Sequence, residues 1–208
     1  AGRYRLFGNK MWISAAEHDL APSITHLVLA RVRGGPAGVK GLSLFIVPRD
    51  VELSDNETVR NDVVVAGLNH KMGQRGTVNA ALNFGEGAFS PDGADGAIGY
   101  LIGSEGQGLS LMFTMMNEAR IGVGTSAAAI GYTGFLHSAE YARTRLQGRP
   151  AASRDPAAPA VAIIEHPDIR RMLLTQKAYV EGALAFNLYC ARLVDEARCS
   201  DDPQEREA

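Results

Sequence analysis

A tryptophan and a serine near the start of the chain are the first residues whose types and spacing suggest a binding role. Trp12 is the only tryptophan, and Ser14 follows it by two residues. Residues two apart in a β-strand lie on one face, so an indole ring and a hydroxyl would be presented together. Such a pair suits a flat apolar ligand that needs an aromatic wall and a hydrogen bond. A single tryptophan is more often a core aromatic, and that alternative stays open.

Polar side chains in a later helical segment form the second candidate group. Arg120 follows Asn117 by three residues, which places both side chains on one helix face. Methionines precede this turn and a glycine-rich stretch follows it, so we expect the face to be buried. A buried guanidinium needs an anionic or dipolar partner, whereas an arginine on a helix is usually a solvated charge. Arg145 follows Tyr141 by four residues, where its simplest role is to stabilise the helix dipole.

The composition excludes several classes of function. With 208 residues the chain has room for one large or two small domains, and a formal net charge of -2 gives no reason to expect nucleic acid or an anionic membrane as partner. Cys190 and Cys199 form no CxxC pair, so neither a metal site nor a redox motif is predicted, and we expect reduced thiols in the cytoplasm. No apolar run is long enough to span a bilayer, and the first residues resemble a strand rather than a secretory leader.

The residue pattern changes near residue 97 from one typical of strands to one typical of helices, which predicts an α+β protein. Residues 1–97 contain short alternating or apolar runs separated by glycine-rich turns, the pattern of a barrel or sandwich. These expected strands cover residues 3–7, 11–14, 26–32, 42–47, 62–68 and 78–84. Residues 98–208 are expected to form a second domain that is helical from about residue 105, with one helix ending near Arg145 and another running from about Pro167 to Ala197. We interpret the glycine-rich residues 103–108 as a tight turn into the first helix, because they lack the endings of nucleotide-binding loops.

Five strings, in the order in which they occur, resemble the acyl-CoA dehydrogenase family over nearly the whole chain. They are GNKMWIS at 8–14, HKMGQRGT at 70–77, GSEGQGL at 103–109 followed by MF at 112–113, MNEARI at 116–121, and YARTR at 141–145. The resemblance implies a middle β-barrel domain, incomplete at its start, followed by the first long helices of an incomplete four-helix bundle. The proline- and alanine-rich loop and the string HPDIRRML at 166–173 are similar to a subgroup with extended C-termini, which includes the 3-methylmercaptopropionyl-CoA dehydrogenases.

The resemblance assigns roles to the candidate residues on the strand and at the helix end. It implies that Trp12, Ile13 and Ser14 contact the flavin of FAD, with the serine hydroxyl near its central ring. It places Arg145 against the pyrophosphate of a neighbouring subunit's FAD, where a fixed guanidinium can form paired bonds. Gln147 falls where a second polar contact is made, although LQG follows the arginine here in place of the family's usual string. EHP at 165–167 resembles the family's Glu-His-Gln turn, and we interpret His166 as a structural loop histidine.

The resemblance also implies a substrate site and a reaction. Asn117 and Arg120 would line the acyl-CoA pocket, while a carboxylate removes the α-proton and the β-hydrogen leaves as hydride to the flavin. The family places its glutamate base either directly before this arginine or far downstream. Ala119 occupies the first position, and Glu118 is turned by about 100° around the helix. No catalytic base is therefore expected within these residues.

The expected activity is α,β-dehydrogenation of an acyl-CoA in fatty acid metabolism, by a homodimer or homotetramer that passes electrons to an electron-transfer flavoprotein. An acyl-CoA oxidase that uses oxygen is one alternative. A flavin-binding relative without dehydrogenase activity, as in the alkylation-response branch, is the other. The near-neutral charge argues against a DNA-associated role.

Overall fold

A computed structural model describes residues 2–53 and 57–202 and divides the chain into two compact units, Ala1–Thr114 and Met115–Ala208. Because the two units are not placed relative to one another, each is described by itself. The sequence predicted a domain boundary after residue 97, and that boundary of the whole protein stays a prediction. Strand β9 (Ala97–Ile102) belongs to the sheets of the first unit, so the compact division falls later.

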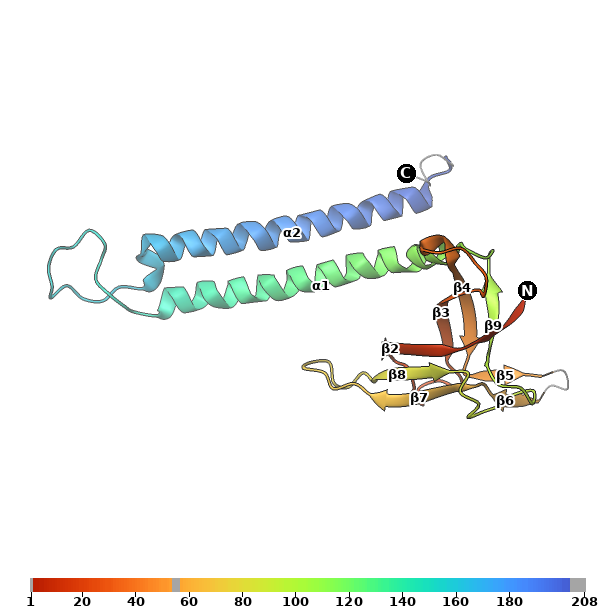
Figure 1. The fold of residues 1–208 in the computed structure, drawn as a ribbon. Coiled ribbons are helices and arrows are strands. Elements are labelled where there is room, and N and C mark those ends of the chain that lie inside the picture. Colours follow the sequence, from red (N-terminus) through yellow and green to blue (C-terminus); the bar gives the residue numbers. More distant parts are fainter. Residues whose placement is uncertain (1, 54–56, 203–208) are drawn as a thin grey trace. The chain divides into compact units, whose positions relative to one another are not determined.

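The first unit contains antiparallel strands arranged in three sheets (Figure 1). The four-stranded sheet has the order β1-β9-β4-β3, the three-stranded sheet has the order β2-β8-β7, and β5 pairs with β6. The remaining bounds are β1 Arg3–Leu6, β2 Gly8–Ser14, β3 Thr25–Arg31, β4 Leu42–Pro48, β5 Asp50–Glu52, β6 Thr58–Arg60, β7 Val63–Leu68 and β8 Asn79–Phe84, with a 3-10 turn at Val39–Gly41. All six strand segments expected from the sequence are confirmed.

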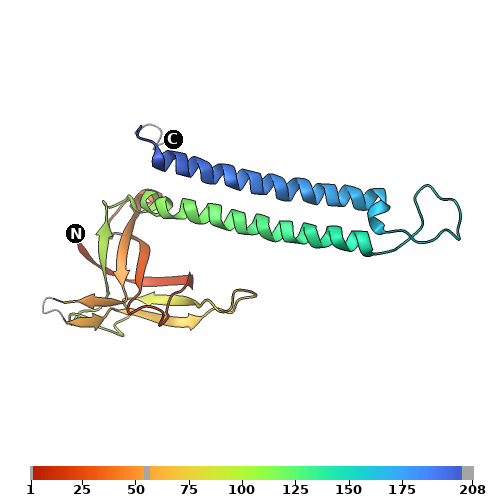
Figure 2. The same ribbon diagram turned by 180° about the vertical axis from the view of Figure 1, so that it is seen from behind.

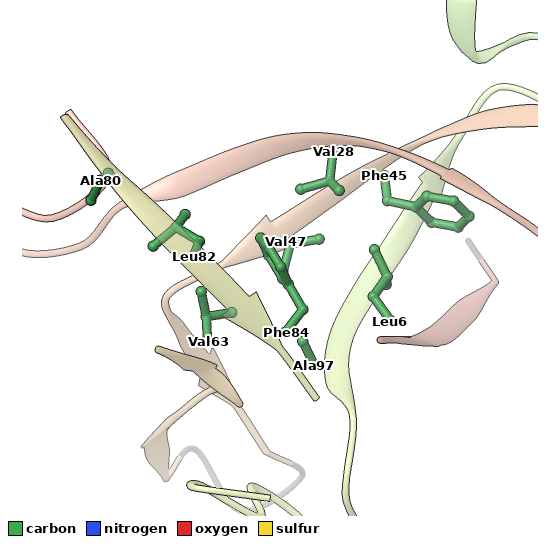
Figure 3. Packing of buried hydrophobic residues seen from close by; sticks show 10 residues of the cluster. Leu6, Val28, Phe45, Val47, Val63, Ala80, Leu82, Phe84 and Ala97 are labelled. Atoms are coloured by element: carbon green, nitrogen blue, oxygen red, sulfur yellow. The ribbon is translucent and has the colours of Figure 1, made fainter. Parts of the chain in front are cut away.

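Alternation of side chains explains how these strands build one apolar core. In β8, Ala80, Leu82 and Phe84 are buried, whereas the residues between them are not. Val28 of β3 and Phe45 of β4 approach the same interior from the other sheet (Figure 3). Each face of a strand repeats every two residues, so a single apolar series is enough to place a strand against the core.

The expectation of a β-barrel is wrong in one respect, because the sheets of the described residues do not close into a barrel. Among those residues, β2 pairs with β8 and β3 pairs with β4, but the ladder does not continue from β2 to β3. Across this opening the Lys10 ammonium donates a hydrogen bond to the Leu29 carbonyl at 2.9 Å. Although β1 and β2 are adjacent in sequence, they belong to different sheets and do not pair with each other.

Two adjacent polar residues without solvent exposure tie the strands and loops of this unit together. The Asn61 amide donates to the carbonyls of Pro48 and Ile98 at 2.7 and 2.9 Å, and its oxygen accepts from the Asp62 and Ile98 amides. The Asp62 carboxylate accepts from the backbone amides of Gly87, Phe89 and Gly96 at 2.8, 3.3 and 3.1 Å. Buried polar groups are stable only when they are paired, and both of these side chains are.

A charged cluster on the same unit joins the segment after β2 to β4 and β6. Glu17 accepts from Arg49 and Arg60 at 2.9 and 2.8 Å, and Arg49 also donates to Asp50. Partial burial acts to raise the pKa of Glu17, but the bonds from Arg60 and Arg49 outweigh it and lower that pKa. The carboxylate is therefore ionised well below neutral pH and holds the segment that follows the tryptophan strand.

The turn between β9 and α1 (Gly108–Thr144) requires glycine because two backbones approach closely. A Cβ atom on Gly108 would lie 2.5 Å from the backbone carbon of Ser43, and one on Gly106 would lie 2.6 Å from the Lys40 carbonyl oxygen. Gly106 also has a positive φ, and its amide donates to the Ser43 hydroxyl at 3.0 Å. The expected tight strand-to-helix turn is confirmed.

The second unit contains most of α1 and α2 (Pro167–Cys199), joined by a loop that includes a 3-10 turn at Ile163–Glu165. The two helices lie side by side and run in opposite directions (Figures 1 and 2). Gly124 allows this approach, because a Cβ there would lie 2.5 Å from the Asn187 side-chain oxygen, and one on Gly131 would lie 3.2 Å from Val180. No helix within the described residues is both long and apolar enough to cross a membrane.

We predict that Asn61→Ala lowers the free energy of unfolding by about 3 kcal/mol, because it leaves several buried backbone groups without partners. Asn83→Ala is the matched control, since Asn83 makes only an exposed side-chain bond with Asn9 at 3.2 Å. Urea denaturation of the protein that carries this segment measures both changes. Equal, small losses for the two variants would contradict the structural role of Asn61.

Candidate functional site

The tryptophan strand is irregular where it carries the indole. The register between β2 and β8 shifts between Lys10 and Ile13, and Trp12 inside this bulge has a φ of 60°. A bulky side chain rarely adopts this left-handed backbone, which costs on the order of 1–3 kcal/mol and is concentrated at functional sites. The Trp12 side chain is 63% exposed, so it is not the core aromatic of the alternative interpretation.

The two residues after the indole point in different directions. Ile13 lies opposite Ala80 and packs against the apolar core, so only its backbone is available to a ligand outside the sheet. Ser14 is exposed, lies opposite Asn79, and accepts a hydrogen bond from the Asn79 amide at 3.3 Å. The bulge means that strand alternation alone does not relate Trp12 to Ser14, and their contact with one ligand stays a prediction.

A cavity of about 630 Å³ adjoins the end of this strand. Residues of the strand, of the following segment and of β3 line it, together with Leu82, Phe84 and Met112. Burial lowers the pKa of His26 in its wall, Glu17 opposes this, and Arg60 and Arg49 add to the lowering. The ring of His26 is therefore neutral at pH 7. Trp12 does not line this cavity, so the exposed indole face and the cavity are separate features.

Asn117 and Arg120 lie on one helix face, as their spacing predicted. The Arg120 guanidinium donates to the Asn117 side-chain oxygen at 3.1 Å. Both residues are exposed in this chain, so the expectation that their face is buried is wrong here. The methionines and glycines around them indicate an apolar neighbourhood in sequence, but burial requires another element to pack on that face.

The acidic residue nearest to Arg120 is already paired. Glu118 forms an ion pair with Arg198 near the end of α2. Ala119, directly before Arg120, cannot take up a proton. The carboxylate of Glu118 thus connects the two helices, and the location of the catalytic base stays a prediction.

Arg145 and Gln147 lie in a short hydrogen-bonded strap directly after α1. The strap consists of residues 145–148 paired with residues 161–163, with a bridge between Leu146 and Ala162. The Arg145 carbonyl accepts from the Ile163 amide at 2.9 Å, and the Gln147 amide donates to the Val161 carbonyl at 2.9 Å. Both side chains are exposed, and within the described residues neither has a side-chain partner.

Within the helical unit, the two candidate arginines lie far apart. Arg120 and Arg145 are separated by about 37 Å along the axis of α1, at about 1.5 Å per residue. The two cations cannot bind the same end of one ligand. The sequence did not predict the contact of His166, although the string EHP at 165–167 had marked this turn.

The chemistry offered by these groups is binding and not proton transfer. An exposed indole with a neighbouring hydroxyl fits a flat ring system, and an exposed guanidinium on an ordered backbone fits a diphosphate. No group of histidine, cysteine, aspartate or glutamate side chains able to hold a metal ion occurs among residues 2–53 and 57–202.

The comparisons with known proteins agree on one family. No family model matches the chain. The chain is 40% identical over 208 residues to 3-methylmercaptopropionyl-CoA dehydrogenase of Ruegeria pomeroyi, covering 100% of this chain and 33% of the relative. It is 41% identical over 201 residues to the broad-specificity linear acyl-CoA dehydrogenase FadE5 of Mycobacterium tuberculosis, covering 94% of this chain and 32% of the relative. The chain spans about a third of the length of these relatives.

Solved structures show the same fold. The structure of Caenorhabditis elegans ACDH-11 in complex with C11-CoA aligns with a TM-score of 0.65 at 24% identity. The alignment covers 96% of this chain and 30% of the ACDH-11 chain. An acyl-CoA dehydrogenase from Bacillus anthracis complexed with FAD matches 98% of this chain and 29% of its own, with a TM-score of 0.63 at 19% identity. The five strings, the confirmed elements and these relatives lead to one assignment: the chain belongs to the acyl-CoA dehydrogenase family.

Proposed function

We propose that the protein containing this segment performs FAD-dependent α,β-dehydrogenation of an acyl-CoA thioester. The observation that carries the proposal is the 40% identity along all 208 residues to a dehydrogenase of this class. The oxidase alternative differs only in the electron acceptor, which the described residues do not distinguish.

The residues present fit a bound FAD. Trp12 offers an exposed aromatic face and Ser14 an exposed hydroxyl, while the Ile13 side chain anchors the strand in the core. Arg145 offers a guanidinium that is not engaged by another side chain of the described residues, with Gln147 beside it. We infer that the first three residues hold the ring system and the last two hold the diphosphate. A bound FAD supplies the acceptor for the hydride that leaves the β-carbon.

Separation along α1 supports an oligomeric enzyme. Because Arg120 and Arg145 lie about 37 Å apart on a rigid helix, we propose that they serve different active sites, with Arg145 holding the FAD of a neighbouring subunit. This requires at least a homodimer, and a homotetramer is equally compatible with it.

Asn117 and Arg120 would act on the substrate without taking its proton. A guanidinium held by an amide oxygen can orient a thioester and stabilise a nearby carboxylate. The α-proton of a thioester is weakly acidic, so a positioned base is required. We propose that this base lies in a part of the protein outside these residues, because Glu118 is paired with Arg198.

The proposal also includes partners and location. An electron-transfer flavoprotein is the proposed acceptor of the electrons. Cys190 and Cys199 are free thiols in the structure, which is compatible with a reducing compartment, and we propose the cytoplasm.

If Trp12 borders the flavin, bound FAD quenches its fluorescence. We expect the emission difference between the full-length protein and Trp12→Phe to fall on adding FAD to the apo-protein and to return on removing it. The difference spectrum isolates Trp12 from other tryptophans of the full-length protein. If the emission difference does not change when FAD is added, the indole does not lie next to the flavin ring system.

Arg145→Ala in the full-length protein should weaken FAD binding by at least about tenfold, because a charge-assisted contact to the diphosphate is lost. Arg143→Ala is the matched control, since Arg143 lies two residues earlier and makes only an exposed pair with Glu140 at 3.7 Å. FAD affinity is measured by titrating apo-protein. If Arg145→Ala binds FAD with an affinity within about twofold of wild type, Arg145 does not contact the diphosphate and acts only as a cation at the helix end.

Because we propose that the base lies outside these residues, the chain alone should not reduce its flavin. The test mixes FAD-loaded protein anaerobically with acyl-CoA substrates and monitors the absorbance of oxidised flavin. We expect no bleaching with the 208-residue chain and rapid bleaching with the full-length protein. Glu118→Gln in the full-length protein should bleach at a rate within about twofold of wild type, since an exposed ion pair contributes little. Bleaching by the short chain, or its loss in Glu118→Gln, would show that a base lies within these residues.

A further inference from the structure

The histidine at the start of α2 makes a contact that links it to the proposed cofactor site. We propose that His166 is a positioning residue: its imidazole binds the backbone of Gln147 and thereby fixes the strap that presents Arg145 and Gln147 to the FAD diphosphate. The inference rests on the proposed function, and it adds a residue that does not itself need to touch the cofactor.

The contact is specific in its geometry. His166 Nε2 lies 2.8 Å from the Gln147 carbonyl oxygen, across nineteen positions of sequence. A carbonyl oxygen only accepts, so Nε2 must carry the proton of this bond. Gly148 follows with a φ of 68°, and a Cβ there would lie 3.4 Å from Nε2, so the ring sits directly over the turn.

His166 does not cap the helix with its side chain, which is the usual role of a polar residue at a helix start. His166 is the N-cap of α2 and makes no side-chain hydrogen bond to the helix, while Pro167 begins the first turn. Serine, threonine, aspartate and asparagine are the residues that cap a helix efficiently. The ring is directed instead to a strand of the strap that carries the guanidinium.

The imidazole completes a set of bonds that leaves the strap little freedom. Backbone bonds hold the Arg145 carbonyl, the Gln147 amide and the Gly148 carbonyl, the last by the Val161 amide at 3.0 Å. His166 holds a further group, the Gln147 carbonyl, and directly after the strap Arg170 donates to the Ile164 carbonyl at 2.8 Å.

A fixed backbone on both sides of Arg145 has a consequence for binding. The guanidinium then needs to order only its own side chain when a diphosphate arrives, whereas a mobile strap would also lose backbone entropy. Removal of the imidazole should therefore lower FAD affinity without removing any atom that contacts the cofactor.

The test compares two substitutions in the full-length protein. His166→Leu removes the donor, and His166→Gln retains an N–H donor near the same place. His137→Leu is the control, because His137 is exposed on α1 and has no side-chain bond among the described residues. For each apo-protein we would measure the dissociation constant for FAD and the thermal midpoint.

We expect His166→Leu to raise the dissociation constant about tenfold, His166→Gln to recover most of the affinity, and His137→Leu to leave it unchanged. Apo-protein midpoints should stay within a few degrees of wild type. In an Arg145→Ala background, His166→Leu should cost less affinity than in the wild type, because part of its effect acts through Arg145.

Two results would overturn the inference. One is wild-type affinity in His166→Leu while Arg145→Ala binds FAD weakly. The other is an undiminished effect of His166→Leu in the Arg145→Ala background. A wild-type protein that does not bind FAD at all would instead overturn the proposed function.

Discussion

The buried pair Asn61 and Asp62 is the interaction on which the sheet unit depends. Its hydrogen bonds join β4, β7, β9 and the loop before β9, which are segments that no single ladder connects. The pair has no solvent exposure, so every one of its polar atoms must find a partner in the protein. The pair lies between β6 and β7, β7 pairs with β8, and β8 in turn pairs with the tryptophan strand. The position of the indole is thus determined by packing far from any ligand.

The candidate residues have the opposite character, because they lie on exposed surfaces of ordered elements. Trp12 stands on a bulge, the Asn117–Arg120 pair on an open helix face, and Arg145 on a strap closed by backbone bonds. None of the α2 residues is buried, and Tyr179 and Phe186 are more than 60% exposed. Helices that expose aromatic residues in this way are typical of bundles in which further helices cover them, so the four-helix bundle stays a supported prediction.

The sequence predicted the elements better than it predicted their environment. Alternation in β8 and the long helical periods are local patterns, and the structure confirms both within a few residues. The burial expected for Arg120 was wrong here, because methionines and glycines show which face is apolar but not whether another element covers it. The prediction of a closed barrel was wrong for a related reason: the sequence shows which segments form strands but not which strand edges pair with each other. The bulge at Trp12 was also missed, since Lys10 to Ser14 contains no glycine or proline to mark it.

By itself, the sequence determined the family, the α+β order of elements, the residue types that we propose for binding a flavin and a diphosphate, and the presence of alanine directly before Arg120. These properties depend on residue identity and on spacing along the chain. Only the tertiary structure decided that Glu118 pairs with Arg198, that His166 holds the Gln147 carbonyl, and that the sheets remain open. Each of these depends on contacts between residues far apart in sequence, and their geometry is set by how whole elements pack rather than by local preference.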